Sequence, residues 1–150
     1  AGIYEYPQTR SIVLGNFWNE DERGIREVKL EDAYDDLPDY FRALLNYEGV
    51  VDEVLTYNIE KYANYDLEVY VMRLKEPSSE DIEHMDGTVC AIRILGYKYR
   101  TMRGLRPLDT AYHAWFLYGY HNPAYSFSYK VKGGYIDTIT FYTRYYGSQL

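Results

Sequence analysis

The chain has 150 residues, about the length of one domain, and its 47% hydrophobic and 18% aromatic content suffices for a packed core and argues against disorder. No apolar run is long enough to cross a bilayer, and the single cysteine excludes an internal disulfide. The net charge of −7 divides unevenly at Asp86: residues 1–86 hold 21 acidic and 8 basic side chains, whereas residues 87–150 hold 2 acidic and 8 basic ones. Such asymmetry is a reason to consider nucleic acid as a partner of the basic half.

The first elements along the chain are predicted to be two strands. Residues 11–18 and 25–30 alternate apolar and polar side chains, and the polar loop between them suits a hairpin.

Helices are predicted to follow these strands. Asp36 suits an N-cap with Pro38 in the first turn, and Gly49 can end the helix. A second helix is predicted from a stripe at helical spacing, formed by Val51, Val54, Leu55, Asn58, Ile59 and Tyr62. One long helix with a kink is the alternative.

Strands return in the middle of the chain. Residues 67–72 and 88–95 are predicted strands, and between them Ser78 and Asp81 resemble the capping box of a short helix that runs to Met85. Residues 97–106 are predicted to be extended. An aromatic helix is expected over residues 107–119, with its core-facing positions at Leu108, Ala111, Tyr112 and Trp115.

The clearest pattern is a hairpin at the end of the chain. Tyrosine, phenylalanine and valine alternate with serine and lysine over residues 125–132, Gly133 and Gly134 form a two-residue turn, and residues 136–144 return. This register places Lys130 opposite Asp137, and Tyr125 opposite Tyr142. The sequence therefore predicts a single α+β domain, residues 1–150, with a largely antiparallel sheet and three or four helices packed on it.

A basic segment free of acids is the first candidate site. On a strand, Tyr97 and Tyr99 would share one face, so that rings could stack on bases while cations on the other face meet phosphate. The alternative is an edge strand whose positive charge deters pairing with another sheet. The predicted nucleic-acid-binding residues are Arg93, Tyr97, Lys98, Tyr99, Arg100, Arg103 and Arg106, with Lys130 and Lys132 as an extension of the same surface.

An acidic segment before residue 88 is the second candidate. Glu80, Glu83 and Asp86 are predicted to hold Mg²⁺ or Mn²⁺ and to act as catalytic carboxylates, with Glu83 as the first choice. Carboxylates beside a strand, followed by cations, have the general layout of metal-dependent nucleases. The alternative is that acids in a first helical turn only complement the helix dipole. The acid-x-Lys signature of many nucleases is absent.

Composition also suggests a resemblance. The tyrosine-rich, cysteine-poor chain, with the tail Tyr142-Thr143-Arg144-Tyr145-Tyr146-Gly147, resembles small proteins of viruses that infect hyperthermophilic archaea. The resemblance implies a thermostable viral protein, similar to compact α+β nucleases of filamentous viruses, that needs an acid near a basic surface. Glu80, Glu83 and Asp86 match that need.

These observations predict a DNA-binding protein, and beyond that a metal-dependent DNA nuclease. The alternative is a non-enzymatic viral structural or protein-interaction module that uses an aromatic surface. DNA is the expected partner, no membrane is expected, and a protein partner or a homo-oligomer stays open.

Cys90 lies in an apolar run and is expected to be buried. We expect an intracellular location, in the host cytoplasm if the protein is viral; no signal peptide is apparent, and a removed leader before Ala1 stays open.

Overall fold

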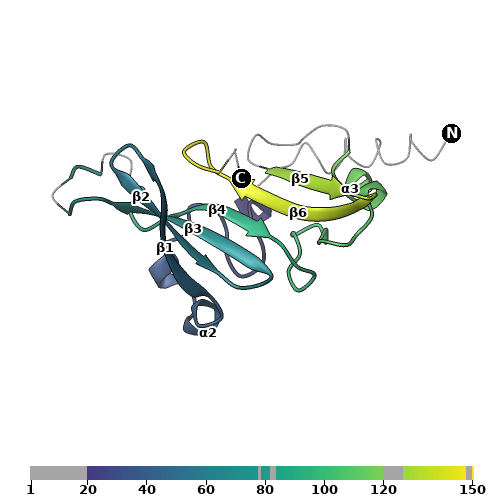
Figure 1. Cartoon of the computed structure of the whole chain (residues 1–150), viewed down its shortest axis with the longest axis horizontal. Helices are drawn as coiled ribbons and strands as arrows, with labels where there is room; N and C mark the ends of the chain where they lie inside the picture. The colour runs from purple at the N-terminus through teal and green to yellow at the C-terminus, as the bar shows by residue number, and fades with distance from the viewer. Residues whose placement is uncertain (1–19, 78, 82–83, 120–126, 148–149) are drawn as a thin grey trace.

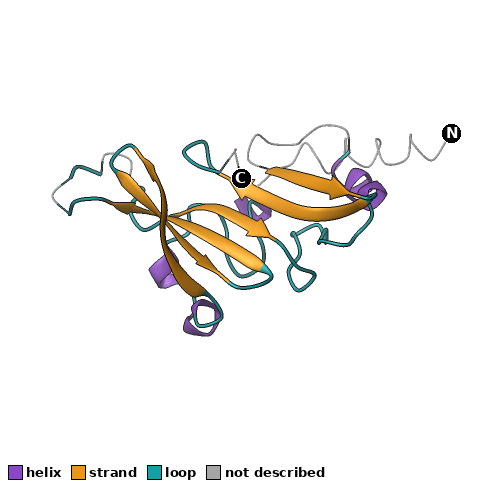
Figure 2. Ribbon diagram, in the orientation of Figure 1, coloured by secondary structure: helices purple, strands orange, loops and turns teal. Residues whose placement is uncertain are grey.

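A single antiparallel sheet dominates the computed structural model, which describes residues 20–77, 79–81, 84–119, 127–147 and 150. The six strands lie in the order β1-β2-β3-β4-β6-β5 (Figures 1 and 2). Their bounds are Asn46–Val54 (β1), Tyr57–Ala63 (β2), Leu67–Leu74 (β3), Val89–Ile94 (β4), Phe127–Lys132 (β5) and Tyr135–Tyr142 (β6). The acidic half of the chain supplies β1 to β3 and the basic half supplies β4 to β6, so the charge asymmetry of the sequence becomes an asymmetry between the two ends of the sheet.

Helices contribute little to the described residues. They comprise two α-helices, α2 (Asp39–Arg42) and α3 (Ala111–Tyr118), and two 3-10 turns, η2 (Glu20–Glu22) and η3 (Tyr34–Asp36). The prediction of three or four helices packed on the sheet is therefore wrong, whereas the antiparallel sheet itself is present. None of the described helices has the length and apolar character needed to span a membrane.

The predicted helix over residues 51–62 is a hairpin of β1 and β2. Residues Leu55 and Thr56 form its two-residue turn, because Val54 pairs with Tyr57. At the start of β2 the buried side chains are Tyr57 and Ile59, two residues apart, as expected for a strand with one face in the core. Most of β1 is exposed on both faces, and its apolar residues carry no strand pattern that a sequence reading could detect. The first predicted helix likewise shrinks to the four residues of α2.

Other predicted elements are replaced by loops. Residues 25–30 form only isolated bridges, which pair Gly24 with Lys29 and Ile25 with Thr101. The described residues of the segment 78–85 are not helical, and residues 97–106 turn rather than extend as a strand. The predicted strand over residues 11–18 lies outside the described residues.

The predicted strands over 67–72 and 88–95 and the terminal hairpin are confirmed as β3, β4 and β5–β6. One detail of register is wrong. Lys132 pairs with Tyr135 and Val131 with Ile136, but an irregularity then shifts Lys130 to Thr138, which leaves Asp137 as the extra residue of a bulge. Tyr125 lies outside the described residues.

The sheet buries side chains on both faces. The larger cluster includes Val69, Ile92 and Phe141, and it is covered by residues 25–45, the loop after β4, and α3. The smaller cluster lies on the other face, around Met72 and Cys90. Cys90 is fully buried as predicted, and this burial raises the pKa of its thiol to about 12. It therefore serves as a small hydrophobic residue rather than a nucleophile.

Candidate nucleic-acid interface

The loop after β4 is held in place by buried hydrogen bonds. The Thr101 N–H donates to the Leu105 carbonyl at 2.8 Å, and the Leu105 N–H donates to the Thr101 hydroxyl at 3.1 Å. Tyr118 of α3 donates its hydroxyl proton to the same Thr101 oxygen at 2.8 Å, and burial raises the pKa of Tyr118. The loop is thus fixed against α3, and the side chains between these anchors have defined directions.

Two of the predicted binding residues point inward from this loop. The guanidinium of Arg103 is paired with Glu22, donates to the Leu117 carbonyl at 3.0 Å, and lies 4.9 Å from the centre of the Tyr118 ring. Tyr99 is a buried member of the larger core cluster. Neither side chain is available to a ligand on the surface, so we leave both out of the interface.

Arg93 belongs to a row of polar side chains across the sheet. It pairs with Glu68 on β3 and Thr140 on β6, and its guanidinium lies 3.6 Å from the Glu68 carboxylate. Lys61 reaches the same carboxylate at 3.0 Å, and Tyr70 donates to it at 2.8 Å. Arg93 thus shares the largely buried Glu68 carboxylate with Lys61, and we assign it a structural role.

The remaining predicted cations are accessible. Lys98, Arg100, Lys130 and Lys132 are exposed, and Arg106 is half-buried with its guanidinium 3.7 Å from the centre of the Tyr97 ring. None of these five side chains forms an ion pair with any other described residue. We call this set the basic end: Lys98, Arg100, Arg106, Lys130 and Lys132.

The basic end draws on both faces of the sheet. Lys130 and Lys132 project on the same face as Arg93, since Ser128 pairs with Thr140 and successive side chains alternate. The loop with Lys98, Arg100 and Arg106 lies over the opposite face, where Tyr99 and Leu105 enter the core. The two groups approach each other where residues 108–111 pair with the start of β6. There the Leu108 N–H donates to the Ile136 carbonyl at 2.8 Å.

The predicted metal ligands do not form a site among the residues that are described. Glu80 is exposed, and Asp86 accepts a hydrogen bond from the Leu74 N–H at 2.9 Å. Glu83, the first choice as catalyst, lies outside the described residues. No group of three or more His, Cys, Asp or Glu side chains in the described part of the chain is placed to hold a metal ion.

Asp81 shows what this segment does structurally. Its carboxylate accepts hydrogen bonds from the Tyr57 hydroxyl and from the N–H groups of Met85 and Asp86. Partial burial would raise the pKa of Asp81, but the hydrogen bonds from Tyr57 and the two N–H groups outweigh burial and hold the pKa below its usual value. This carboxylate closes the loop between β3 and β4.

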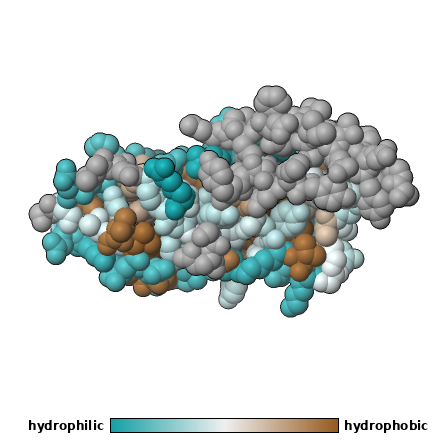
Figure 3. Space-filling view, turned by 90° about the horizontal axis from the view of Figure 1, so that it is seen from above, coloured by the Kyte–Doolittle hydropathy of each residue, from teal (hydrophilic) through white to brown (hydrophobic). Residues whose placement is uncertain are grey.

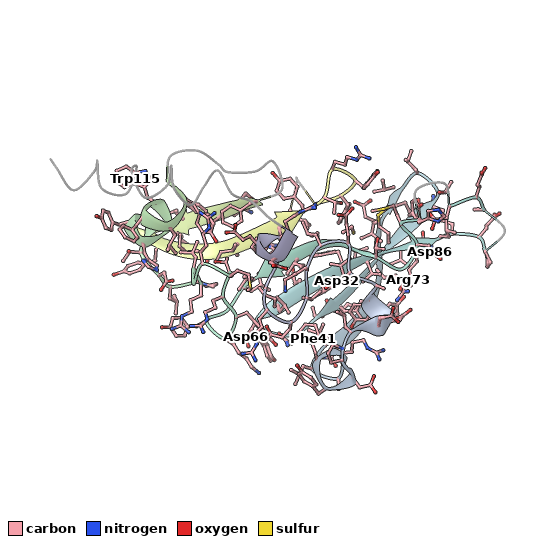
Figure 4. The ribbon with its side chains drawn as sticks, turned by 180° about the vertical axis from the view of Figure 1, so that it is seen from behind. Asp32, Phe41, Asp66, Arg73, Asp86 and Trp115 are labelled. Carbon is pink, nitrogen blue, oxygen red and sulfur yellow. The ribbon has the colours of Figure 1, made fainter. Side chains whose placement is uncertain are left out.

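Distance also separates the acidic segment from the basic end. Asp86 precedes β4 and the basic loop follows it, and six residues of strand span about 20 Å. Asp86 and Trp115 of α3 accordingly lie far apart along the long axis of the molecule (Figure 4). A metal held at Glu80 or Asp86 would therefore not share a phosphate with the cations of the loop.

The structure adds exposed residues that the sequence pattern had assigned to the core. Leu108 is 68% exposed and Tyr112 is 45% exposed, whereas the buried residues of α3 are Ala114, Leu117 and Tyr118. The predicted core stripe of this helix is therefore wrong. The prediction also passed over Tyr135, which is 54% exposed directly after the Gly133-Gly134 turn. Its position next to the predicted Gly-Gly turn could have indicated that Tyr135 is exposed.

No protein family, curated protein or solved structure matches this chain. The resemblance to proteins of archaeal viruses stays a prediction.

Proposed function

We propose that the chain binds nucleic acid through the basic end and that its activity there is binding rather than cleavage. The observation that carries the proposal is the distribution of ion pairs. Arg73 and Lys61, on β3 and β2, each contact two carboxylates, whereas the five cations of the basic end have no carboxylate partner among the described residues. Cations that no described carboxylate neutralises keep their attraction for phosphate, and four of these five are exposed.

The chemistry of these side chains fits a phosphate backbone. Lys98, Lys130 and Lys132 present compact charges, and the guanidinium of Arg100 can donate two hydrogen bonds to one phosphate. The five cations outnumber the acids nearby: Glu22 is paired with Arg103, and the basic half holds only Asp109, whose carboxylate accepts a hydrogen bond from the Arg106 N–H at 3.0 Å, and Asp137, which is exposed on β6. The basic end therefore has a local positive field although the whole chain is acidic.

Salt-dependent binding tests this proposal. The affinity for a fluorescent DNA duplex is measured by anisotropy from 50 to 300 mM NaCl. The logarithm of the association constant is expected to fall linearly with the logarithm of the salt concentration, with a slope of about −0.9 for each neutralised phosphate. Lys130→Ala with Lys132→Ala is expected to weaken binding about tenfold or more near 0.1 M salt and to reduce the slope by up to about two. Lys98→Ala with Arg100→Ala is expected to act alike.

Lys75→Ala is the matched control, because Lys75 lies at the acidic end and is paired with Glu53. It is expected to leave affinity and slope unchanged. Each sample is also incubated with Mg²⁺ and with Mn²⁺. Intact DNA supports binding without cleavage. If the parent protein cuts DNA only when metal is present, and the double variant Glu80→Ala with Asp86→Asn does not cut it, the result supports the nuclease prediction instead. Affinity that is equal for all variants and independent of salt contradicts the proposal.

A further inference from the structure

Exposed tyrosine side chains lie on the segments that meet at the basic end, where residues 106–112 meet the start of β6. The backbone there is continuous with the sheet: Thr110 bridges to Tyr135, and the Ala111 N–H donates to the Gly134 carbonyl at 2.9 Å. On the edge of β6 that pairs with β4, residues 108–111 thus continue the hydrogen bonding past the end of β4. The side chains on this frame therefore have fixed positions relative to one another.

Three tyrosine rings flank this frame, with Tyr135 on the face of Lys132 and Tyr97 in the loop over the opposite face. Tyr97 is 48% exposed and lies against the Arg106 guanidinium. Tyr135 is 54% exposed and pairs across the hairpin with Lys132, so a ring and a cation project on the same face. Tyr112 is 45% exposed and contacts the edge of Trp115, with ring centres 6.1 Å apart. Each ring is thus accompanied by a cation or by a second ring.

Leu108 adds an unusual feature at the same place. Its side chain is 68% exposed, and its backbone has a φ of 76°, a conformation that L residues with a side chain rarely adopt. The hydrogen bond from its N–H to Ile136 holds it there. Leu108 follows Arg106 by two residues, and its N–H bonds the residue next to Tyr135, so its exposed apolar side chain lies on the backbone that connects the tyrosine–arginine stack to the lysine–tyrosine pair. An apolar side chain held outward on a strained backbone indicates a surface built for contact.

We propose that these residues form a base-stacking platform and that the nucleic acid bound at the basic end is single-stranded. The platform consists of Tyr97, Arg106, Leu108, Tyr112 and Tyr135. This inference rests on the proposed function and adds the ligand class. Rings can stack only on bases that are not already stacked in a duplex, and the neighbouring cations follow the backbone of the strand. Cations without rings would favour the duplex, whose charge density is higher.

Exposed rings occur elsewhere, and this supplies the control. On the face drawn in Figure 3 a few apolar patches stand among hydrophilic side chains; tyrosine falls near the middle of that hydropathy scale, so these patches do not mark its rings. Tyr65 is 98% exposed, but it lies in the turn between β2 and β3, in the acidic half. If the platform acts through both charge and rings, Tyr65 contributes nothing to binding.

The test compares three probes of equal length: a single strand of mixed sequence, its duplex, and a strand with abasic sites that keeps the phosphates. The protein is expected to bind the single strand about tenfold more tightly than either of the others, and tyrosine fluorescence is expected to be quenched by the single strand alone. Tyr135→Leu, and separately Tyr97→Leu, should reduce the affinity for the single strand about fivefold to tenfold, with the salt slope unchanged. Tyr65→Leu should match the parent.

The outcomes separate this inference from the proposed function. If all three probes bind equally and the Tyr135 and Tyr97 variants bind like the parent, while Lys130→Ala with Lys132→Ala loses affinity, phosphate binding stands and stacking is overturned. If no probe binds, both fail, and the rings are left to contact protein. Circular dichroism of each variant confirms that lost affinity does not reflect unfolding.

Discussion

Arg73 shows how much one side chain contributes to this fold. From β3 its guanidinium donates to both carboxylate oxygens of Asp35, at 2.9 and 3.1 Å, and to Glu60 at 3.1 Å. It also reaches the Tyr62 hydroxyl at 3.3 Å. Tyr62 in turn stacks on Tyr34, with ring centres 4.2 Å apart. The residue thereby ties the segment before α2 to the sheet, and lysine cannot reproduce this forked geometry.

We predict that Arg73→Lys lowers the free energy of unfolding by about 1–2 kcal/mol at pH 7. The effect stays modest because Asp35 is two-thirds exposed and solvent screens the pair. The hydrogen bond from Arg73 lowers the pKa of Asp35, so this contribution is present above the unfolded pKa of about 3.9 and is lost as pH falls through the lower folded pKa. The difference between variant and parent should therefore narrow below about pH 4.

Urea unfolding at pH 7 and pH 3 measures this difference. Arg26→Lys is the control, since Arg26 is exposed and has no ion pair within the described residues. A gap between Arg73→Lys and the parent that is equally large at both pH values would show that the pair with Asp35 is not its cause.

At the scale of elements, the β1–β2 hairpin has a turn of unusual composition. Leu55 occupies the first turn position with a φ of 55°, and it is 82% exposed. Hairpin turns at such φ values normally use glycine, asparagine or aspartate, because a larger side chain is strained there. Leu55 buries little surface in return, so the strain is not offset by packing.

Leu55→Gly is therefore predicted to stabilise the protein by about 0.5–1 kcal/mol, since a two-residue turn with positive φ at its first position alone normally has glycine there. Thermal unfolding should show a higher midpoint for this variant. Leu55→Ala is the control: it removes the exposed side chain but keeps the strain, and its midpoint should stay near that of the parent. A lower midpoint for Leu55→Gly would mean that Leu55 makes contacts worth more than the strain.

At the scale of the whole molecule, the order of the strands explains how an acidic chain can attract a polyanion. The acids Glu48, Asp52 and Glu53 lie on β1 at one edge, and Lys130 and Lys132 lie on β5 at the other. Five steps between neighbouring strands put these edges about 24 Å apart. The screening length at physiological salt is about 8 Å, so the acidic edge has little effect on a ligand at the basic end.

Neutralising the acidic edge should accordingly change the affinity for DNA only at low salt. Asp52→Asn with Glu53→Gln is predicted to change the affinity for DNA less than about twofold at 0.15 M NaCl, and to increase it clearly near 0.01 M, where the screening length reaches about 30 Å. The measurement is the same anisotropy titration at both salt concentrations. An increase of equal size at both would place the acids within direct contact distance of the ligand.

Local patterns in the sequence determined several parts of this protein. Strands β3 and β4 have apolar runs between turn residues, the β5–β6 hairpin has alternation and a Gly-Gly turn, and burial of Cys90 follows from its apolar neighbours. The charge division at Asp86 also survives into space, because β1 to β3 precede β4 to β6 in the sheet as in the chain. In these cases neighbours in sequence suffice, since hairpins and alternation depend on residues close along the chain.

Only the tertiary structure decided the rest. The spacing from Val51 to Tyr62 fits a helix by itself, and pairing of β2 with β3 makes it a hairpin. Arg103 and Arg93 look like free cations until Glu22 and Glu68, distant in sequence, are placed beside them. The bridge between Thr110 and Tyr135 likewise brings the exposed rings together. Which cations stay free, and which rings stand beside them, depends on contacts between residues far apart in the chain, and no local pattern records those contacts.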